Sequence, residues 1–294
     1  MYADIILPAD TALERTDCHW AYGSWFLGIN KPVIEPLGES INNTELFRML
    51  ADKMGYVDST DNAFTQTDEE IIKDILLEAE NEDGERFNCL TEGIDYDDVV
   101  KNGWARASTG SKRRDFLKNG WPTPSGKIEI KCEAITAEYP DVSPFPEYVP
   151  EINGQYDPNK EKFPIQVLSS ASHYFIGDSF QSVPRLQAMQ SRPTVEISLG
   201  DAKARGIEDG DLVRLYNDNG ETYCYAVLIE GLLDGVCATQ KQFKGSNTPG
   251  GLNVNNLNSE MLTDFGKSPT FYSVLVEIEK ASEEMTKKAI KQGV

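Results

Sequence analysis

The chain has 294 residues, which corresponds to about two domains at roughly 150 residues each. Its 28 Lys and Arg residues against 48 Asp and Glu residues give a formal net charge of -20 at pH 7, and a charge of this sign repels phosphate backbones and anionic lipid surfaces. No apolar run approaches the ~20 residues of a membrane span, and the first residues lack the basic segment of a signal peptide. The composition therefore indicates globular domains and argues against nucleic acid as the main partner.

The cysteines and histidines do not form a metal-binding pattern. An odd number of unclustered cysteines is typical of reduced thiols buried as small hydrophobic residues. The two histidines, His19 and His173, are too few for a histidine-rich site, so a metal here would need ligands from elsewhere. The cysteines never form C-x-x-C and are spread over the chain: Cys18, Cys89, Cys132, Cys224 and Cys237.

The first predicted element is a buried strand over Tyr2–Pro8, which stops at a proline as strands of βα units do. A core strand of this kind normally follows the crossover that pairs it, so we expect the first part of its domain to be missing here. Apolar residues then recur at helical spacing over Thr44–Tyr56, and Gly55 is placed to end that helix.

Two further helices are predicted before residue 103. Thr67 and Glu70 have the spacing of a capping box, and the helix that follows has one apolar and one acidic face. A short helix over Asp95–Asn102 is closed by Gly103. The acidic stretch 68–98 is typical of a solvated face, and a recruitment surface for a basic partner stays the alternative.

Between Gly103 and Pro164 the sequence indicates an irregular connector. It contains the basic run Lys112–Arg114, a predicted strand over Lys127–Cys132 and a proline-rich stretch up to Pro150. We therefore expect a domain boundary near residue 155.

The second half shows the signals of short strands in a compact barrel or sandwich. Asn217–Gly220 predicts a hairpin turn of residues that tolerate positive φ. A short helix over Leu199–Arg205 is expected between a Ser198 cap and Gly206, and a charged, loosely held helix from Ala281 onward. The expected strands are Ile165–Ser169, Thr194–Ser198, Asp211–Tyr216, Tyr223–Ile229, Val236–Gln240 and Phe271–Ile278.

Two polar groups are the candidate binding residues. Ser169–Tyr174, followed by Gly177–Ser179, comes directly after a predicted strand, and Gly245–Gly251 leads to Asn253, Asn255 and Asn256. Hydroxyl, imidazole and amide groups on loops make directed hydrogen bonds to a polar ligand, such as the edge of a pterin or purine. The same composition also occurs in ordinary turns. No nucleophile elbow, H-E-x-x-H motif, P-loop or G-x-G-x-x-G motif is present.

Five segments together resemble the molybdenum and tungsten bis-pterin oxidoreductases of the dimethyl sulfoxide reductase type. One such motif is weak, but five in the same order over most of the chain are specific. The segments are Tyr2–Pro8 with Glu14 and Arg15, Ile34–Ser40 with the helix after it, Thr123–Glu129, the region from Phe163 onward, and Asp201–Asp211.

The resemblance implies an α/β plus all-β fold. Residues 1–155 would be the trailing part of an α/β dinucleotide-fold region with a connector. Residues 156–280 would form a double-psi β-barrel that binds a molybdopterin guanine dinucleotide, and 281–294 a charged tail.

The resemblance also implies a set of cofactor-binding residues. Where related reductases commonly have His-Ser in the loop after the first barrel strand, this sequence has Asp178-Ser179. Glu14 resembles the glutamate that follows the first strand in this family and is therefore a candidate cofactor-binding residue. Its alternative role is capping or a buried ion pair. The implied cofactor-binding residues are Ser170, His173, Tyr174, Ser179, Asn255, Lys267, Pro269, Tyr272 and Glu14.

The family's cysteine cluster and its metal ligand lie upstream of the residues present here, so no catalytic or metal-ligating residue is assigned. We expect the complete enzyme to hold bis-molybdopterin guanine dinucleotide with Mo or W, and this chain alone to hold none and to be inactive. Its partners would be the missing N-terminal domains, in the same chain or in a separate subunit, and an electron-transfer iron-sulfur subunit. The substrate class would be a sulfoxide, an N-oxide or a sulfur compound such as polysulfide or thiosulfate, with a leaning toward sulfoxides. The resemblance leaves open whether the complete enzyme is cytoplasmic or exported to the periplasm by a twin-arginine signal.

Two other functions remain open on the sequence alone. A non-catalytic barrel that carries or stores pterin would bind its ligand tightly without the rest of an enzyme. A hydrolase that uses His173 with Asp178 has no evident nucleophile.

Overall fold

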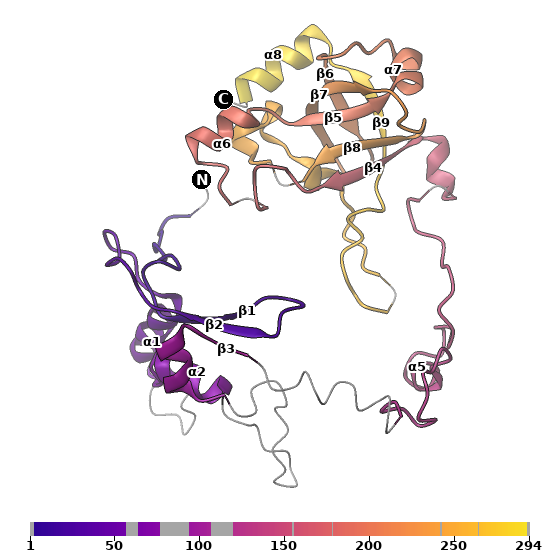
Figure 1. Ribbon diagram of the computed structural model, residues 1–294. Coiled ribbons are helices and arrows are strands. Elements are labelled where there is room, and N and C mark those ends of the chain that lie inside the picture. Colours follow the sequence, from indigo (N-terminus) through magenta and orange to yellow (C-terminus); the bar gives the residue numbers. More distant parts are fainter. Residues whose placement is uncertain are drawn as a thin grey trace. The chain divides into compact units, whose positions relative to one another are not determined.

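The computed structural model describes residues 3–56, 64–76, 94–106, 120–154, 156–177, 179–241, 243–263 and 265–292. The chain divides into two compact units, Met1–Glu129 and Ile130–Val294 (Figure 1). The boundary near residue 155 stays a prediction, because compactness does not decide to which domain a connector belongs.

The first unit is built on a small antiparallel sheet that the sequence did not predict. Its strands β1 (Asp17–Trp20), β2 (Phe26–Asn30) and β3 (Trp104–Arg106) are hydrogen-bonded in the order β1-β2-β3. The helices are α1 (Asn43–Met54), α2 (Asp68–Leu76) and α3 (Tyr96–Asn102). A dinucleotide fold is built on parallel strands, whereas the described sheet is antiparallel. The assignment of this unit to the trailing part of such a fold therefore remains a prediction. The buried core is small and consists of Leu27, Ile29, Ile72, Leu76 and Val99.

The three helices confirm their predicted ends. Thr67 N–H donates to the Glu70 carboxylate (2.8 Å), and Glu70 N–H donates to the Thr67 hydroxyl (3.2 Å), which is a reciprocal capping box. Gly55 and Gly103 end α1 and α3 in the left-handed conformation, at φ 76° and 77°. The apolar face of α1 is exposed, however, and Phe47 is 60% accessible.

Two predicted strands are wrong. Residues 3–8 form no strand and expose Ile6 to 81%, since within the described residues only an isolated bridge, Ala9 to Ile41, joins this region to another segment. Residues 127–132 also form no strand. Here the Ser125 N–H donates to the Glu129 side chain (2.8 Å) and closes a local turn. An alternating pattern predicts a strand only where a partner completes the ladder.

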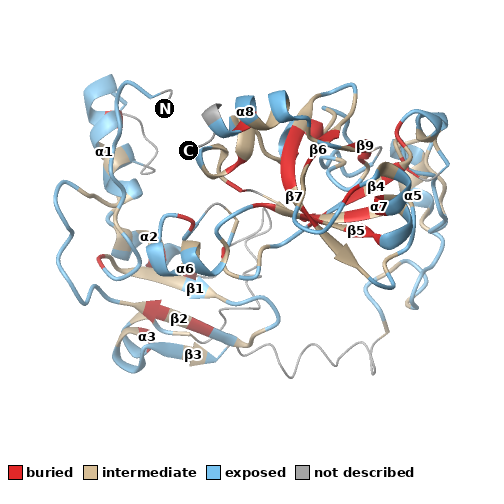
Figure 2. Cartoon of the chain, turned by 90° about the horizontal axis from the view of Figure 1, so that it is seen from above, coloured by how far each residue is buried: buried red, intermediate tan, exposed pale blue. Residues whose placement is uncertain are grey.

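The second unit contains a closed six-stranded barrel with the strand order β4-β8-β5-β7-β6-β9. Figure 2 shows buried residues concentrated on these strands. The core includes the completely buried Ile165, Ile197, Leu215 and Val276. The barrel strands are β4 (Ile165–Ser170), β5 (Thr194–Ser198), β6 (Leu212–Tyr216), β7 (Glu221–Ile229), β8 (Val236–Gln240) and β9 (Leu275–Lys280).

The pairing directions place three connections at one end of the barrel. The pairs β4–β8 and β5–β7 are parallel, and the pairs β5–β8, β6–β7, β6–β9 and β4–β9 are antiparallel. It follows that β4, β6 and β8 finish at the same end at which β5, β7 and β9 begin. We call this the loop end; it carries residues 171–193, 217–220 and 241–274. The opposite end, the helix end, carries α7 (Leu199–Arg205) and residues 230–235.

Short helical elements fill the remaining connections of this unit. No helix in the described ranges combines the length and apolar character that crossing a bilayer requires. The elements are α5 (Glu133–Glu138), η4 (Pro158–Glu161), α6 (Pro184–Met189), η5 (Gly245–Asn247), η6 (Pro249–Gly251), η7 (Val254–Leu257) and α8 (Glu283–Gln292).

Local signals in the barrel are confirmed with two corrections. Ser198 caps α7 by accepting from Asp201 N–H (3.0 Å), and residues 217–220 join β6 to β7 in an antiparallel hairpin. None of those four turn residues has a positive φ; Gly220 is needed because a Cβ there would lie 2.6 Å from the Asn256 carbonyl oxygen. The last strand begins at Leu275 instead of Phe271, since Ser273 N–H donates to Thr270 C=O in a turn (2.9 Å).

Candidate functional site

Eight of the nine predicted site residues lie in the second unit, on segments that belong to the loop end. The ninth, Glu14, lies in the first unit. Ser170 is the last residue of β4, and the other seven come from the connection after β4 and from the connection between β8 and β9, which are far apart in sequence. They are Ser170, His173, Tyr174, Ser179, Asn255, Lys267, Pro269 and Tyr272.

The first loop, residues 171–183, starts where β4 ends. The Ser170 hydroxyl donates to the Thr239 carbonyl at 3.4 Å. The rings of His173 and Tyr174 meet edge to face, with centroids 4.8 Å apart. His173 and Ser179 are exposed, so the loop presents an imidazole and a hydroxyl to solvent. Asp178 lies outside the described residues, and the suggested His173–Asp178 pair stays untested.

The second loop, residues 241–257, contains three asparagines within four positions, and their side chains differ in the hydrogen bonds that they make. The Asn253 side chain caps η7 by accepting from Asn255 N–H (3.0 Å), and the Asn256 amide donates to the Asn253 carbonyl (2.9 Å). The Asn255 side chain is exposed and makes no hydrogen bond within the described residues. Of the three, Asn255 is the one whose amide is available to a ligand.

The third loop, residues 258–274, returns to the barrel beside β4. Val167 N–H donates to Val274 C=O (2.9 Å), and the Gln166 side chain donates to Tyr272 C=O (3.5 Å). This loop projects from the barrel (Figure 1) and contains Lys267. Pro269, in the same loop, forms a bridge with Leu262.

Backbone strain is concentrated on these loops. Phe180 in the first loop has φ 68° and Lys267 in the third has φ 50°. Residues with side chains rarely adopt this left-handed region, and such outliers cluster at ligand sites. Asn153 is the other non-glycine residue with positive φ among those described.

Several polar side chains at the helix end hydrogen-bond to one another, whereas three predicted site residues at the loop end do not. At the helix end, the Ser198 hydroxyl donates to Asp234 (2.6 Å), and the Asp201 carboxylate accepts from Gly235 N–H (2.6 Å) and pairs with Arg205 (3.0 Å). At the loop end, the side chains of Ser179, Asn255 and Lys267 make no hydrogen bond within the described part of the chain. These three side chains therefore have hydrogen-bonding capacity left for a ligand.

A cavity of about 270 Å³ lies at the loop end between the hairpin, the third loop and the connector. No predicted site residue lines it. Its volume is below the 300–1,000 Å³ typical of sites that enclose a whole drug-sized ligand. The sequence predicted residues 217–220 only as a hairpin turn. Their sequence, Asn-Asp-Asn-Gly, was the signal that these side chains could also line a polar cavity. The lining residues are Ile152, Asn153, Asn159, Phe163, Asn217, Asp218, Asn219, Leu257, Ser259, Met261, Ser273, Val274 and Leu275.

Glu14 performs a capping role. Its carboxylate is buried and accepts hydrogen bonds from Thr11 N–H and Leu37 N–H, each at 2.7 Å. These two backbone hydrogen bonds lower the pKa of Glu14 below its ordinary value. The carboxylate is thus committed to the chain, which agrees with the capping alternative.

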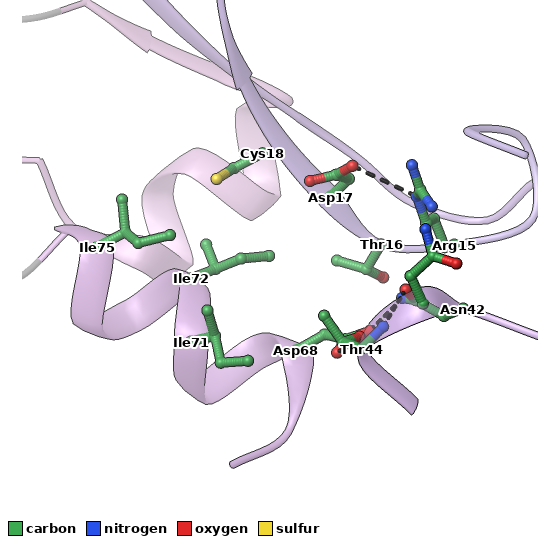
Figure 3. Close-up of a pocket in the computed structure, with 11 residues that line it drawn as sticks. Arg15, Thr16, Asp17, Cys18, Asn42, Thr44, Asp68, Ile71, Ile72 and Ile75 are labelled. Carbon is green, nitrogen blue, oxygen red and sulfur yellow. Dashed lines mark hydrogen bonds and ion pairs between the residues drawn. The ribbon is translucent and has the colours of Figure 1, made fainter. Parts of the chain in front are cut away.

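A second cavity, of about 240 Å³, lies in the first unit between β1, the start of α1 and one face of α2 (Figure 3). Asp68 joins the two helices, since its carboxylate accepts from Asn42 (2.6 Å) and Thr44 (2.5 Å) and pairs with Arg48 (3.0 Å). Burial raises the pKa of the Cys18 thiol, which keeps it protonated. The polar groups around this cavity hold the unit together.

Within the described residues, no three His, Cys, Asp or Glu side chains lie close enough together to hold a metal ion. Two thiols lie inside the barrel, and burial raises the pKa of Cys224 to about 12 and that of Cys237 still further. Neutral thiols are poor metal ligands, so these two cysteines are core residues.

Comparison with known proteins decides the family. The model of the molydopterin dinucleotide binding domain matches residues 165–275, which span β4 to the start of β9. Over 280 residues the chain is 33% identical to the probable oxidoreductase YoaE of Bacillus subtilis (strain 168), covering 95% of this chain and 38% of that protein. It is also 27% identical to the dimethyl sulfoxide reductase DmsA of Escherichia coli (strain K12), covering 95% of this chain and 36% of that protein.

The chain belongs to the dimethyl sulfoxide reductase family of molybdopterin oxidoreductases. It corresponds to the C-terminal part of such an enzyme and spans little more than a third of the length of these relatives. The cofactor of the complete family enzymes is a Mo or W bis-pterin dinucleotide. The fold agrees: acetylene hydratase from Pelobacter acetylenicus superposes with a TM-score of 0.70 at 17% identity, over 93% of this chain and 38% of that one.

The residues at the loop end fit this cofactor. Ser179 and Asn255 supply a hydroxyl and an amide that make no hydrogen bond within the described residues, and Lys267 supplies a cation for an anionic pyrophosphate. The adjoining cavity is too small to enclose a dinucleotide by itself.

Proposed function

We propose that this chain is the cofactor-binding portion of a molybdenum or tungsten bis-pterin oxidoreductase. The observation that carries the proposal is the match of the family model to residues 165–275, the domain whose loop end carries eight predicted cofactor residues on two distant segments. The complete enzyme would catalyse two-electron or oxygen-atom transfer on a sulfoxide, an N-oxide or a sulfur oxyanion. Relatives named dimethyl sulfoxide reductase and trimethylamine-N-oxide reductase favour the first two substrates.

The proposed roles follow from the chemistry of the loop-end side chains and from which of them make no hydrogen bond within the described residues. Asn255 would donate and accept at a pterin edge, and Ser179 would donate to it. Lys267 would contact the pyrophosphate, and Tyr272 with Pro269 would cover the ligand from the third loop. Ser170, His173 and Tyr174 would form the wall from the first loop. Glu14 acts through the loop that it holds.

When bound, the metal and its pterins would supply the electron transfer, and the protein would supply binding, orientation and electrostatics. This chain's contribution would be to exclude water from one side of the cofactor and to hold the polar groups in place. No proton-transferring residue is assigned to this chain.

We also propose the finer fold assignment. A double-psi barrel is supported by two parallel strand pairs, β4–β8 and β5–β7, within an otherwise antiparallel closed barrel. The assignment of the first unit to the trailing part of an α/β dinucleotide-fold region is supported by the similarity to YoaE, which extends over 95% of the chain.

The chain alone is proposed to be inactive, with the rest of the enzyme in the same polypeptide or in a separate subunit. The relatives are between two and three times as long as this chain, which supports partner domains of substantial size. An iron-sulfur electron-transfer subunit is a further proposed partner. A pterin-carrying module without redox activity remains the alternative, because acetylene hydratase shows that this fold also occurs in a protein named for a hydration.

Metal and pterin analysis of the protein from its native host tests the proposal. The expected result is Mo or W together with pterin on a polypeptide, or a complex, that contains this chain and reduces a sulfoxide or an N-oxide with a reduced dye. Pterin without metal or dye-dependent reduction would favour the carrier alternative. The absence of both pterin and metal would contradict the proposed function.

A further inference from the structure

One buried polar side chain joins the first and second loops of the loop end. Gln181 is 1% exposed. Its Oε1 accepts from Lys244 N–H (2.8 Å), and its Nε2 donates to Gly177 C=O (3.1 Å). A single amide thus connects the backbone of residues 171–183 to the backbone of residues 241–257.

Two further contacts cross between the same loops. The Phe175 and Phe243 rings are buried and meet edge to face, with centroids 5.8 Å apart. The Lys244 ammonium donates to the Ser182 hydroxyl (2.6 Å). The buried amide therefore sits between an aromatic pair and a surface hydrogen bond, in a direct contact of the two loops.

Gln181 also adjoins the strained part of the first loop. Phe180 is left-handed at φ 68° and is exposed, so its conformation gains little from burial of its own ring. Hydrogen bonds on either side hold it, because Ser179 N–H donates to Ile176 C=O (3.0 Å) and Val183 N–H donates to Phe180 C=O (3.0 Å). Strain of this kind persists only where the surroundings determine the conformation.

On the other side, Lys244 begins the turns that lead to Asn255. The Lys244 carbonyl accepts from Asn247 N–H (2.8 Å) and from the buried Thr248 hydroxyl (2.9 Å). The Thr222 hydroxyl then fixes the next segment by donating to Leu252 C=O (3.0 Å). The position of Lys244 is thereby transmitted along residues 244–255.

We propose that Gln181 is a positioning residue that sets the distance between Ser179 on the first loop and Asn255 on the second. This inference rests on the proposed function, since it concerns how two ligand-binding loops are kept in register. Because the Gln181 side chain is buried, the loss of these two hydrogen bonds leaves Lys244 N–H and Gly177 C=O without this partner, and the loops separate. Gln181 itself does not contact the ligand in this account.

The test compares Gln181→Met with Gln240→Met. Both substitutions replace an amide by an unbranched side chain of similar length. Gln240 makes its hydrogen bonds to Thr194 and does not join the two loops (3.1 Å to Thr194 N and 2.8 Å to Thr194 Oγ1). Hydrogen exchange of the 294-residue chain is the first readout, and pterin content of the protein from its native host is the second.

The expected result for Gln181→Met is exchange that rises by about tenfold or more in both 171–183 and 241–257, with a several-fold loss of bound pterin. Gln240→Met should change neither by more than twofold. Lys244→Met removes only the surface hydrogen bond to Ser182, and it should raise hydrogen exchange in both loops by a smaller factor. This variant provides the test if Gln181→Met does not fold. A rise confined to one loop, or pterin kept at the control level, would overturn the inference. Absence of pterin from the unsubstituted protein would instead count against the proposed function, and the exchange experiment would still decide whether Gln181 couples the loops.

Discussion

The Asn217 side chain donates a hydrogen bond to the carbonyl of Leu257 across 2.9 Å, although the two residues are 40 positions apart. The same amide donates to Leu275 C=O (3.1 Å), and its oxygen accepts from Asn219 and Gly220 N–H (2.9 and 3.2 Å). One turn residue thus fastens the hairpin, η7 and the start of β9 to each other.

Asn217→Ala should lower the free energy of unfolding by about 2–3 kcal/mol, because four hydrogen bonds disappear and two carbonyls lose a donor. Asn219→Ala is the matched control. Asn219 makes one side-chain hydrogen bond as donor, to Leu257 at 3.2 Å, and is exposed, so its loss should cost about 0.5 kcal/mol. Equal effects of the two substitutions in urea unfolding would contradict this role for Asn217.

Asn255→Ala should reduce bound pterin several-fold while the melting temperature stays within about 1 °C. The reason is that the Asn255 side chain makes no hydrogen bond within the described residues and is exposed, so removing it costs the fold little. Pterin content and thermal unfolding of the same preparation give both quantities. A fall in melting temperature as large as that of Asn217→Ala would show that Asn255 is a structural residue.

The cysteines should differ in their reaction with iodoacetamide at pH 8, where only the thiolate reacts. Burial raises the pKa of Cys224 to about 12, and that of Cys237 and Cys18 is also raised by burial. Of the four cysteines in the described residues, we expect half-buried Cys132 to be modified first in the native chain, and Cys224 and Cys237 only after unfolding. Peptide mass spectrometry gives each rate, and modification of native Cys224 as fast as Cys132 would contradict the closed barrel core.

Glu14 should titrate below its ordinary pKa of 4.5, since hydrogen bonds from Thr11 and Leu37 N–H favour the carboxylate. Because the folded-state pKa is lowered, its contribution to stability is complete above about pH 4.5 and is lost as the pH falls through the folded value. The amide resonances of Thr11 and Leu37 should therefore shift together with one midpoint below 4.5, and Glu14→Gln should abolish that shared titration. Independent midpoints for the two amides would be inconsistent with a single shared acceptor.

The sequence predicted the elements whose signals are local. Capping at Thr67 and Ser198, the helix end at Gly103 and the turn at Asn217 each depend on residues within four positions of one another, and each is confirmed. The structure also explains the first residue of the motif Asp201–Asp211. The Asp201 carboxylate accepts a hydrogen bond from Gly235 N–H and pairs with Arg205, and it thereby connects the start of α7 to both residues.

Features that depend on distant partners were not predictable in the same way. The strand expected over Tyr2–Pro8 has the right residues but no ladder among the described segments, and the sheet of β1, β2 and β3 was missed because its strands are only three to five residues long. The loop end itself follows from the strand pairing, which joins residues of β4 to residues of β8 that are 70 positions away. No local pattern carries that information, and the same holds for the contact of Gln181 with Lys244.

Hydrogen exchange of the cofactor-loaded protein against the cofactor-free protein tests the central claim most directly. The account predicts that loading protects residues 171–183 and 241–274 at the loop end and leaves α7 and residues 230–235 at the helix end unchanged. Protection at the helix end, or no protection of either loop in a protein that contains the cofactor, would contradict the placement of the cofactor at the loop end.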